Sequence, residues 1–132
     1  MKKFNKKKLP SRHTTLGADK APQRSFYYAM DLKEKDIAKP FVGVVSTWNE
    51  AAPCNINLMK QAQSVKKGVQ ATGGTPREFC TITVTDGIAM GHEGMKSSLI
   101  SREVIADSAE LTVRGHCYDA LVGIAGCDKS LP

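Results

Sequence analysis

The sequence predicts an α/β fold, a parallel sheet of the three-layer, doubly wound type whose strands are joined by crossover helices. Three observations carry this prediction. Apolar, β-branched runs recur along the chain, amphipathic stretches separate them, and glycines close the stretches. In sheets of this type ligands bind outside the carboxyl ends of the strands, so the residues that directly follow each strand are the first candidates for a functional site.

The three predicted strands are short runs rich in Val, Ile, Thr and Phe. They cover residues 41–47, 79–85 and 120–125, and none of them contains a charged residue. β-Branched and aromatic side chains favour extended backbone, and uncharged runs are typical of strands covered on both faces. The two crossovers between these strands are expected to be right-handed.

Helices are predicted before the first strand and between the strands. The first covers about residues 23–32 and follows Pro22, whose fixed φ suits a first helical turn. The second is capped by Asn55 or Asn57 and ends at the glycine pair 73–74. Its apolar stripe repeats at helical spacing and consists of Leu58, Ala62, Val65 and Val69.

A third helix is predicted to begin at Ser101, after a glycine- and methionine-rich loop over residues 86–95. It is expected to end near Gly115. Its predicted inner face consists of Val104, Ile105, Ala109 and Val113.

The net charge of +6 is concentrated at the N-terminus. Six of the 19 basic residues precede His13, whereas the other 13 are balanced by 13 acidic residues. These six are Lys2, Lys3, Lys6, Lys7, Lys8 and Arg12. We therefore expect residues 1–20 to be a basic flexible tail and entry loop, residues 21–132 to be the α/β domain, and no nucleic acid to be a partner.

The apolar runs and the cysteines bear on the compartment. No run is long enough to span a membrane, and no apolar segment follows the N-terminal lysines as in a signal peptide. The four cysteines of this chain are therefore expected to be reduced thiols in the cytoplasm.

Metal-binding residue types follow each predicted strand. Cys54 follows the first, Asp86 the second, and Cys127-Asp128-Lys129 the third. Carboxyl ends of parallel strands meet at one edge, so these side chains are expected to converge. Thiolates select iron or zinc and carboxylates select magnesium or manganese, which predicts two different metals in one crevice.

Other interpretations of these residues remain open. No CxxC occurs, so each cysteine is also compatible with simple packing, which is our interpretation of Cys80 and Cys117. The Asp86-Gly87 pair fits a turn. His92 and Glu93 fit either a solvated loop tip or, with their neighbouring glycines, an anion site. No phosphate loop and no GxGxxG motif is present.

Three longer motifs make the pattern specific. They cover residues 85–95 (TDGIAMGHEGM), 101–108 (SREVIADS) and 126–129 (GCDK). In this order they resemble the dihydroxy-acid dehydratases, from the family that also contains 6-phosphogluconate and sugar-acid dehydratases. The resemblance extends from about residue 11 to residue 132. The first two motifs favour the branched-chain members, with the 6-phosphogluconate and sugar-acid members as the alternative.

The resemblance implies ligands for two cofactors. The family holds an iron–sulfur cluster, [2Fe-2S] or [4Fe-4S], with three cysteines, and Cys54 and Cys127 match two of them. It also binds Mg²⁺, for which Asp86 and Asp128 match ligands. Lys129 matches a lysine that is carbamylated in some members.

The resemblance also implies a reaction and a missing remainder. The reaction is dehydration of 2,3-dihydroxy-3-methylbutanoate and its ethyl homologue to 2-oxo acids on the way to valine and isoleucine. The third cysteine, a glutamate ligand, the serine base and a C-terminal barrel domain are expected beyond residue 132. The complete enzyme is expected to be a homodimer. This chain alone is expected to be an inactive, incomplete N-terminal domain, or a non-catalytic remnant that serves as a binding module.

Overall fold

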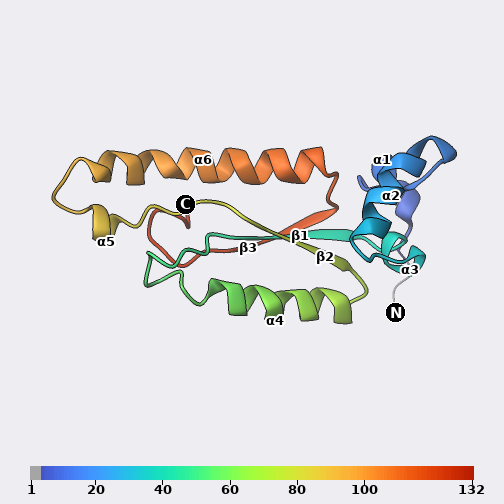
Figure 1. The fold of residues 1–132 in the computed structure, drawn as a ribbon, viewed down its shortest axis with the longest axis horizontal. Coiled ribbons are helices and arrows are strands. Elements are labelled where there is room, and N and C mark those ends of the chain that lie inside the picture. The colour runs from blue at the N-terminus through green and yellow to red at the C-terminus, as the bar shows by residue number, and fades with distance from the viewer. Residues whose placement is uncertain (1–3) are drawn as a thin grey trace.

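Three parallel strands form the centre of the molecule. The computed structural model describes residues 4–132 and places β1 (Phe41–Ser46) between β2 (Thr75–Cys80) and β3 (Ala120–Ile124). The long helices α4 (Leu58–Ala71) and α6 (Gly94–Gly115) lie on opposite faces of this sheet (Figure 1). The α/β architecture with crossover helices is therefore confirmed.

The register of the sheet brings the three strand ends level with one another. Ser46, the last residue of β1, is paired with Cys80 of β2 and with Ile124 of β3. The segments that leave the strands therefore begin side by side at one edge. We call this edge the exit edge; it lies on the left in Figure 1, where α5 (Asp86–Ala89) and the C-terminus are found.

Helix α4 follows the predicted stripe. Leu58 and Ala62 are buried, and Val65 and Val69 are half-buried. The helix ends before Gly73, whose φ of +90° is a left-handed conformation that glycine adopts without the steric cost of a Cβ atom. The periodicity and the terminating glycine pair are confirmed.

Helix α6 begins seven residues earlier than predicted, and α5 interrupts the predicted loop. Ser101 does not cap the helix but is buried within it, where its hydroxyl donates to the carbonyl of Ser98 at 2.6 Å. The Ser98 hydroxyl in turn donates to the carbonyl of Val84 at 2.7 Å. Polar residues thus occupy the inner face of the first turns of α6. These turns therefore lack the apolar spacing from which the helix was predicted. Val104, predicted on the inner face, is exposed.

The second strand also differs from its prediction. β2 begins at Thr75 and ends at Cys80, whereas residues 81–85 lie outside the ladder even though they alternate like a strand. Pro76 lies within β2, which is tolerated because β2 is an edge strand and one of its sides needs no N–H donor. The prediction of 79–85 was therefore largely wrong, because it shares only Phe79 and Cys80 with β2.

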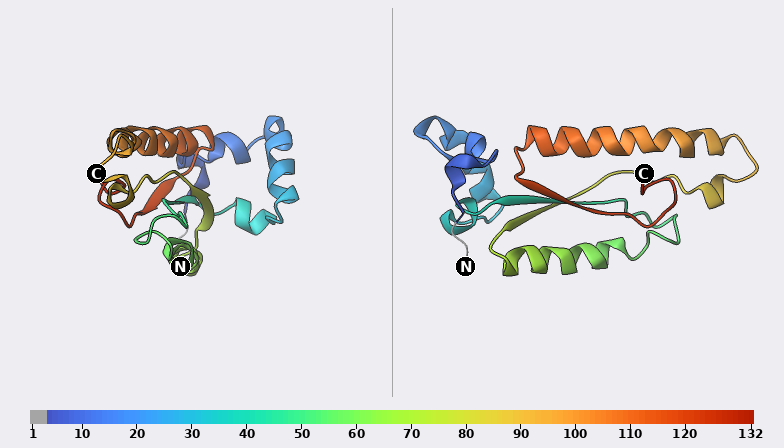
Figure 2. Two further views of the ribbon diagram at one scale, coloured as in Figure 1. Left: turned by 60° about the vertical axis from the view of Figure 1, so that its left-hand side comes forward. Right: turned by 180° about the vertical axis from the view of Figure 1, so that it is seen from behind.

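The N-terminal segment is folded onto the end of the sheet that faces away from the exit edge (Figures 1 and 2). It forms the short helices η1 (Lys6–Lys8), α1 (Arg12–Thr15), η2 (Ala18–Lys20), α2 (Ala21–Ala29) and α3 (Glu34–Ile37). Lys6 and Ser11 are buried, so residues 6–20 are not the solvated tail that the charge pattern predicted. Lys2 and Lys3 lie outside the described residues. The first predicted helix corresponds to α2 and ends earlier, before Asp31 at φ +60°.

Asp119 fastens this segment to the sheet. One of its carboxylate oxygens accepts from the Ser11 N–H at 2.8 Å, and the other accepts from the Ser11 hydroxyl at 2.6 Å and the Phe41 N–H at 2.7 Å. Beside it, Tyr27 packs edge-on against Phe41, with ring centroids 5.1 Å apart. The core there also contains Leu32 and Ile37. Along residues 4–132, no helix combines the length and apolar character needed to cross a bilayer.

Candidate functional site

The segments after the three strands meet at the exit edge. The Thr85 hydroxyl lies 3.3 Å from the Cys127 sulfur, and the Asp86 carboxylate lies 3.9 Å from the same sulfur. The other Asp86 oxygen is 3.8 Å from the Lys129 amine. Residues separated by more than 40 positions are therefore in contact, as the strand-exit argument predicted.

Cys54 joins this group from the segment after β1. Its thiol lies against Cys127 and Thr85, and its carbonyl lies against Gly126. Burial raises the pKa of the Cys54 thiol, and the neighbouring Cys127 raises it further. All four cysteines are free thiols. Cys54 and Cys127 can therefore bind a soft metal ion once each thiol has lost its proton.

The Cys127 thiol has the opposite tendency. Burial alone would raise its pKa, but contacts with Thr85, with Cys54 and with the backbone of residues 128 and 129 together hold the pKa below its ordinary value. Hydrogen bonds to the thiolate favour the charged form. Of the two thiols, Cys127 is therefore the one whose surroundings favour deprotonation.

Asp128 and Lys129 form an adjacent pair at the rim of the site. A hydrogen bond and the positive charge of Lys129 lower the pKa of Asp128, and the same hydrogen bond raises the pKa of Lys129. Asp128 is mostly exposed, whereas Lys129 lies between Asp128 and Asp86. In this structure the lysine is the cation that balances two carboxylates.

The donor set fits part of two metal shells. Two thiols suit iron, and two carboxylates suit a hard ion such as magnesium. Within the part of the chain that the structure describes, no group of three or more His, Cys, Asp or Glu side chains is arranged to hold a metal ion. The residues present therefore supply a fraction of each set of ligands.

Several sequence candidates lie outside this group. His92 and Glu93 are exposed. The ring of His92 makes local contacts: its Nε2 lies 3.0 Å from the Ile88 carbonyl, and its Nδ1 accepts a hydrogen bond from the Gly94 N–H at 3.0 Å. The loop-tip interpretation therefore fits them. Cys80, predicted to be packed, is instead exposed, with its sulfur 3.6 Å from the Ser46 hydroxyl. Cys117 is half-buried near the end of α6.

Three residues that contribute to the site escaped the sequence analysis. Thr85 was assigned to a strand, Asn55 was considered only as a helix cap, and Gly126 was considered only as part of a motif. The structure places Asn55 and Gly126 between the two cysteine loops and places Thr85 against both thiols. Their proximity in sequence to Cys54, Asp86 and Cys127 was the available signal.

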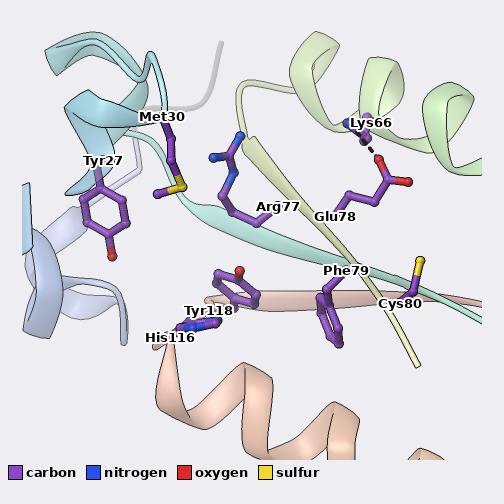
Figure 3. A pocket seen from close by; sticks show the side chains of 9 residues that line it. All are labelled: Tyr27, Met30, Lys66, Arg77, Glu78, Phe79, Cys80, His116 and Tyr118. Atoms are coloured by element: carbon purple, nitrogen blue, oxygen red, sulfur yellow. Dashed lines mark hydrogen bonds and ion pairs between the residues drawn. The ribbon is translucent and has the colours of Figure 1, made fainter. Parts of the chain in front are cut away.

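Two cavities differ in their relation to the site. A cavity of about 240 Å³ adjoins Thr85, and its walls are largely apolar, with Ala52, Val84, Ile88 and Ala89 among them. A second cavity of about 600 Å³ extends along β2 from Tyr27 and Tyr118 to Cys80, and Lys66 pairs with Glu78 at its wall (Figure 3). None of the proposed ligand residues lines either cavity, but the first lies beside Thr85, which contacts both thiols.

A parallel α/β domain with thiols and carboxylates gathered at its strand exits has the arrangement of the α/β proteins that bind their ligands beyond the carboxyl ends of the strands. Comparison with known proteins gives the family. Residues 39–132 match the family model described as dihydroxy-acid/6-phosphogluconate dehydratase N-terminal, and the chain belongs to this family.

Curated relatives extend the likeness to the whole chain. It is 90% identical over 132 residues to a dihydroxy-acid dehydratase of Pelagibacter ubique and 77% identical over 131 residues to one of Parvibaculum lavamentivorans. A dihydroxy-acid dehydratase of Metallosphaera sedula is 57% identical over 116 residues, or 88% of this chain. The chain spans 23% of the length of the first two relatives and 21% of the third.

Proposed function

We propose that this chain is the N-terminal part of a dihydroxy-acid dehydratase. This hydro-lyase would remove water from 2,3-dihydroxy-3-methylbutanoate and its ethyl homologue to give the 2-oxo acids that precede valine and isoleucine. The observation that carries the proposal is the meeting of Cys54, Asp86 and Cys127 at one edge of the sheet. The names of the relatives support the same reaction class.

The residues of the site divide between two cofactors in this proposal. Cys54 and Cys127 would ligate an iron–sulfur cluster, and Asp86 and Asp128, with a carbamylated Lys129, would ligate Mg²⁺. When bound, these groups supply Lewis acidity at the leaving hydroxyl and at the substrate carboxylate. The contribution of the chain is to favour deprotonation of Cys127 and to keep the Asp86 carboxylate beside it.

Lys129 needs a change of state to serve as a ligand. The hydrogen bond to Asp128 and the nearby Asp86 carboxylate raise the pKa of the amine and favour its protonated form, which cannot react with carbon dioxide to form a carbamate. A metal ion would replace its charge between Asp86 and Asp128. Carbamylation is therefore expected to accompany metal binding rather than precede it.

The small cavity beside Thr85 supports a branched-chain substrate. Its walls contain alanine, valine and isoleucine side chains, which suit the alkyl groups of a methyl- or ethyl-branched acid. A sugar acid would place hydroxyl groups against these walls, where they would find few partners. This contrast supports the branched-chain enzyme over the sugar-acid dehydratases.

The rest of the proposed enzyme lies outside the 132 residues. We expect it to supply a third cysteine, a glutamate ligand, the serine base and a barrel domain, and to continue the sheet into a larger three-layer, doubly wound domain. A boundary near residue 20 remains our expectation for the α/β domain, although residues 6–20 are folded against the sheet. A homodimer is the expected assembly. The free thiols support a reducing compartment such as the cytoplasm.

Cysteine replacement tests this proposal in the full-length protein that contains the chain. Cys54→Ala and Cys127→Ala should each reduce iron and sulfide content to background and abolish the visible absorption of the cluster. Cys117→Ala is the matched control and should retain the cluster, because its thiol lies away from the exit edge. Equal iron in all three variants would show that the ligand assignment is wrong.

A further inference from the structure

We infer that Asn55 and Gly126 are positioning residues that set the spacing between the thiols of Cys54 and Cys127. Each lies next to one of these cysteines in the sequence, Asn55 after Cys54 and Gly126 before Cys127. The inference rests on the proposed function, in which both thiols bind one cluster. It assigns a role to two residues that do not themselves ligate metal.

Gly126 is in unusually close contact with the other cysteine loop. A Cβ atom at this position would lie 2.3 Å from the Cys54 carbonyl oxygen and 2.8 Å from Oδ1 of Asn55. The nearest atom belongs to backbone, so it cannot rotate away as the end of a side chain would. At Gly68 and Gly115, by contrast, a Cβ would meet nothing within 4 Å. Only the absence of a side chain at 126 lets the two loops touch.

Asn55 ties the same loop to the ends of the strands. It is completely buried, and its amide group donates to the carbonyl of Thr47 at 2.6 Å and to the Thr47 hydroxyl at 3.0 Å. The Thr47 N–H donates to the carbonyl of Ile124, the last residue of β3, at 3.3 Å. A continuous series of contacts therefore runs from Cys54 through Asn55 and Thr47 to the strand that leads to Cys127.

The carbonyl oxygen of the Asn55 side-chain amide lies at the contact with Gly126. Among the described residues its Oδ1 has no hydrogen-bond partner, although it is buried and turned toward Gly126. A buried acceptor without a donor is a cost to stability, because it has lost its hydrogen bonds to water. The unpaired oxygen lies at the point where the two cysteine loops meet. This location fits a residue whose role is to position the loops rather than to stabilise the fold.

The distance between the loops that carry Cys54 and Cys127 therefore tolerates little change. Ordinary van der Waals contact begins at 3.4 Å, so a methyl group at 126 would push the Cys54 carbonyl away by about 1 Å. Ligand distances in a metal site are held to about 0.2 Å. A displacement of this size would therefore move one thiol out of range of a centre that the other still reaches.

A trivalent arsenical measures this spacing without any cluster. Phenylarsine oxide forms two arsenic–sulfur bonds with a pair of nearby thiols, and the two thiol protons leave with its oxygen as water. In the 132-residue chain carrying Cys80→Ser and Cys117→Ser, we expect one arsenical bound per chain. Gly126→Ala should weaken its binding at least tenfold, whereas the matched control Gly68→Ala should leave binding unchanged. Circular dichroism reports whether each variant is folded.

Asn55→Ala provides an independent variant, because removing a side chain creates no clash. It should also weaken arsenical binding, and in the full-length protein it should lower the iron retained after reconstitution. Wild-type arsenical affinity in folded Gly126→Ala, or in Asn55→Ala if the first variant does not fold, would overturn the inference. Failure of the unsubstituted thiols to capture the arsenical would overturn it as well.

The two proposals fail in distinguishable ways. If the chain captures the arsenical as expected but the full-length protein binds no iron, the proposed cluster is wrong and the spacing role stands. If Gly126→Ala and Asn55→Ala retain the cluster at the wild-type level, the positioning role is wrong and the proposed function stands.

Discussion

The two ends of the sheet differ in how completely their polar groups are hydrogen-bonded. At the end that carries the N-terminal helices, the Asp119 carboxylate accepts three hydrogen bonds, and aromatic rings close the core. At the exit edge, two carboxylates share one amine, two thiols lie against each other, and a buried amide oxygen has no partner among the described residues. Satisfied polar groups stabilise a fold, whereas unsatisfied and like-charged groups reduce stability and are ready to bind a ligand.

This difference shows where stability and function are separated in the chain. Both ends use aspartate, but Asp119 is surrounded by donors from the protein, while Asp86 has one distant amine and a thiol. Substitutions at the first end should therefore change folding, and those at the second should change ligand binding.

The largest effect on stability is expected from Asp119→Ala. It removes the acceptor of three hydrogen bonds and leaves the Phe41 N–H and Ser11 without a partner, which should cost about 3 kcal/mol of unfolding free energy. Urea denaturation followed by circular dichroism measures the loss. Asp107→Ala, at an exposed position on α6, is the control and should stay within about 0.5 kcal/mol of the wild type. Similar midpoints for both variants would contradict the comparison.

A smaller effect on stability is expected from Asp86→Asn. The ion pair that it removes is 3.8 Å long and partly exposed, so the unfolding free energy should change by less than about 1 kcal/mol. In the full-length protein, the same substitution should weaken Mg²⁺ binding by about 100-fold if Asp86 is a ligand, as isothermal titration would measure. A loss of stability comparable to that of Asp119→Ala would erase the distinction between the two ends.

A third effect on stability concerns the pH dependence of Lys6. Burial lowers the pKa of this lysine from 10.5 to about 8, although the Asp119 carboxylate opposes the shift. Between these values the unfolded chain binds more protons than the folded one, so stability should rise as the pH increases from 8 to 10.5. The expected rise is about 1 kcal/mol after allowance for solvent screening.

Lys6→Met should remove this rise, because methionine has no proton to lose. Urea midpoints measured at pH 7.5 and pH 10 for both proteins give the difference. The comparison between the variants cancels the contributions of the tyrosines and cysteines that titrate over the same range. Parallel pH profiles for the two proteins would show that Lys6 is not buried as the structure has it.

The sequence was most informative where one residue type has one physical role. The β-branched runs became β1 and β3, and the stripe from Leu58 to Ala62 became the buried face of α4. The meeting of Cys54, Asp86 and Cys127 followed from topology alone, because parallel strands end at a common edge. No knowledge of side-chain packing was needed for that step.

The sequence was misleading where polar residues are buried or tertiary contacts override local preference. The buried serines at 98 and 101 concealed the first turns of α6, since their hydroxyls bond to carbonyls inside the protein. Pro76 concealed the start of β2, because only the sheet order shows that this strand lies at an edge. Lys6 resembled a solvated charge, but its amine donates to the Lys39 carbonyl at 2.6 Å and lies over the ring of Phe41.

The unpaired side of β3 determines where a further strand could join the sheet. Within residues 4–132, this strand pairs with β1 alone, so its other side presents free N–H and C=O groups. A further strand that joined there in parallel would finish at the same height as Ile124. The residue that follows it would then emerge at the exit edge, beside the segment that follows β3.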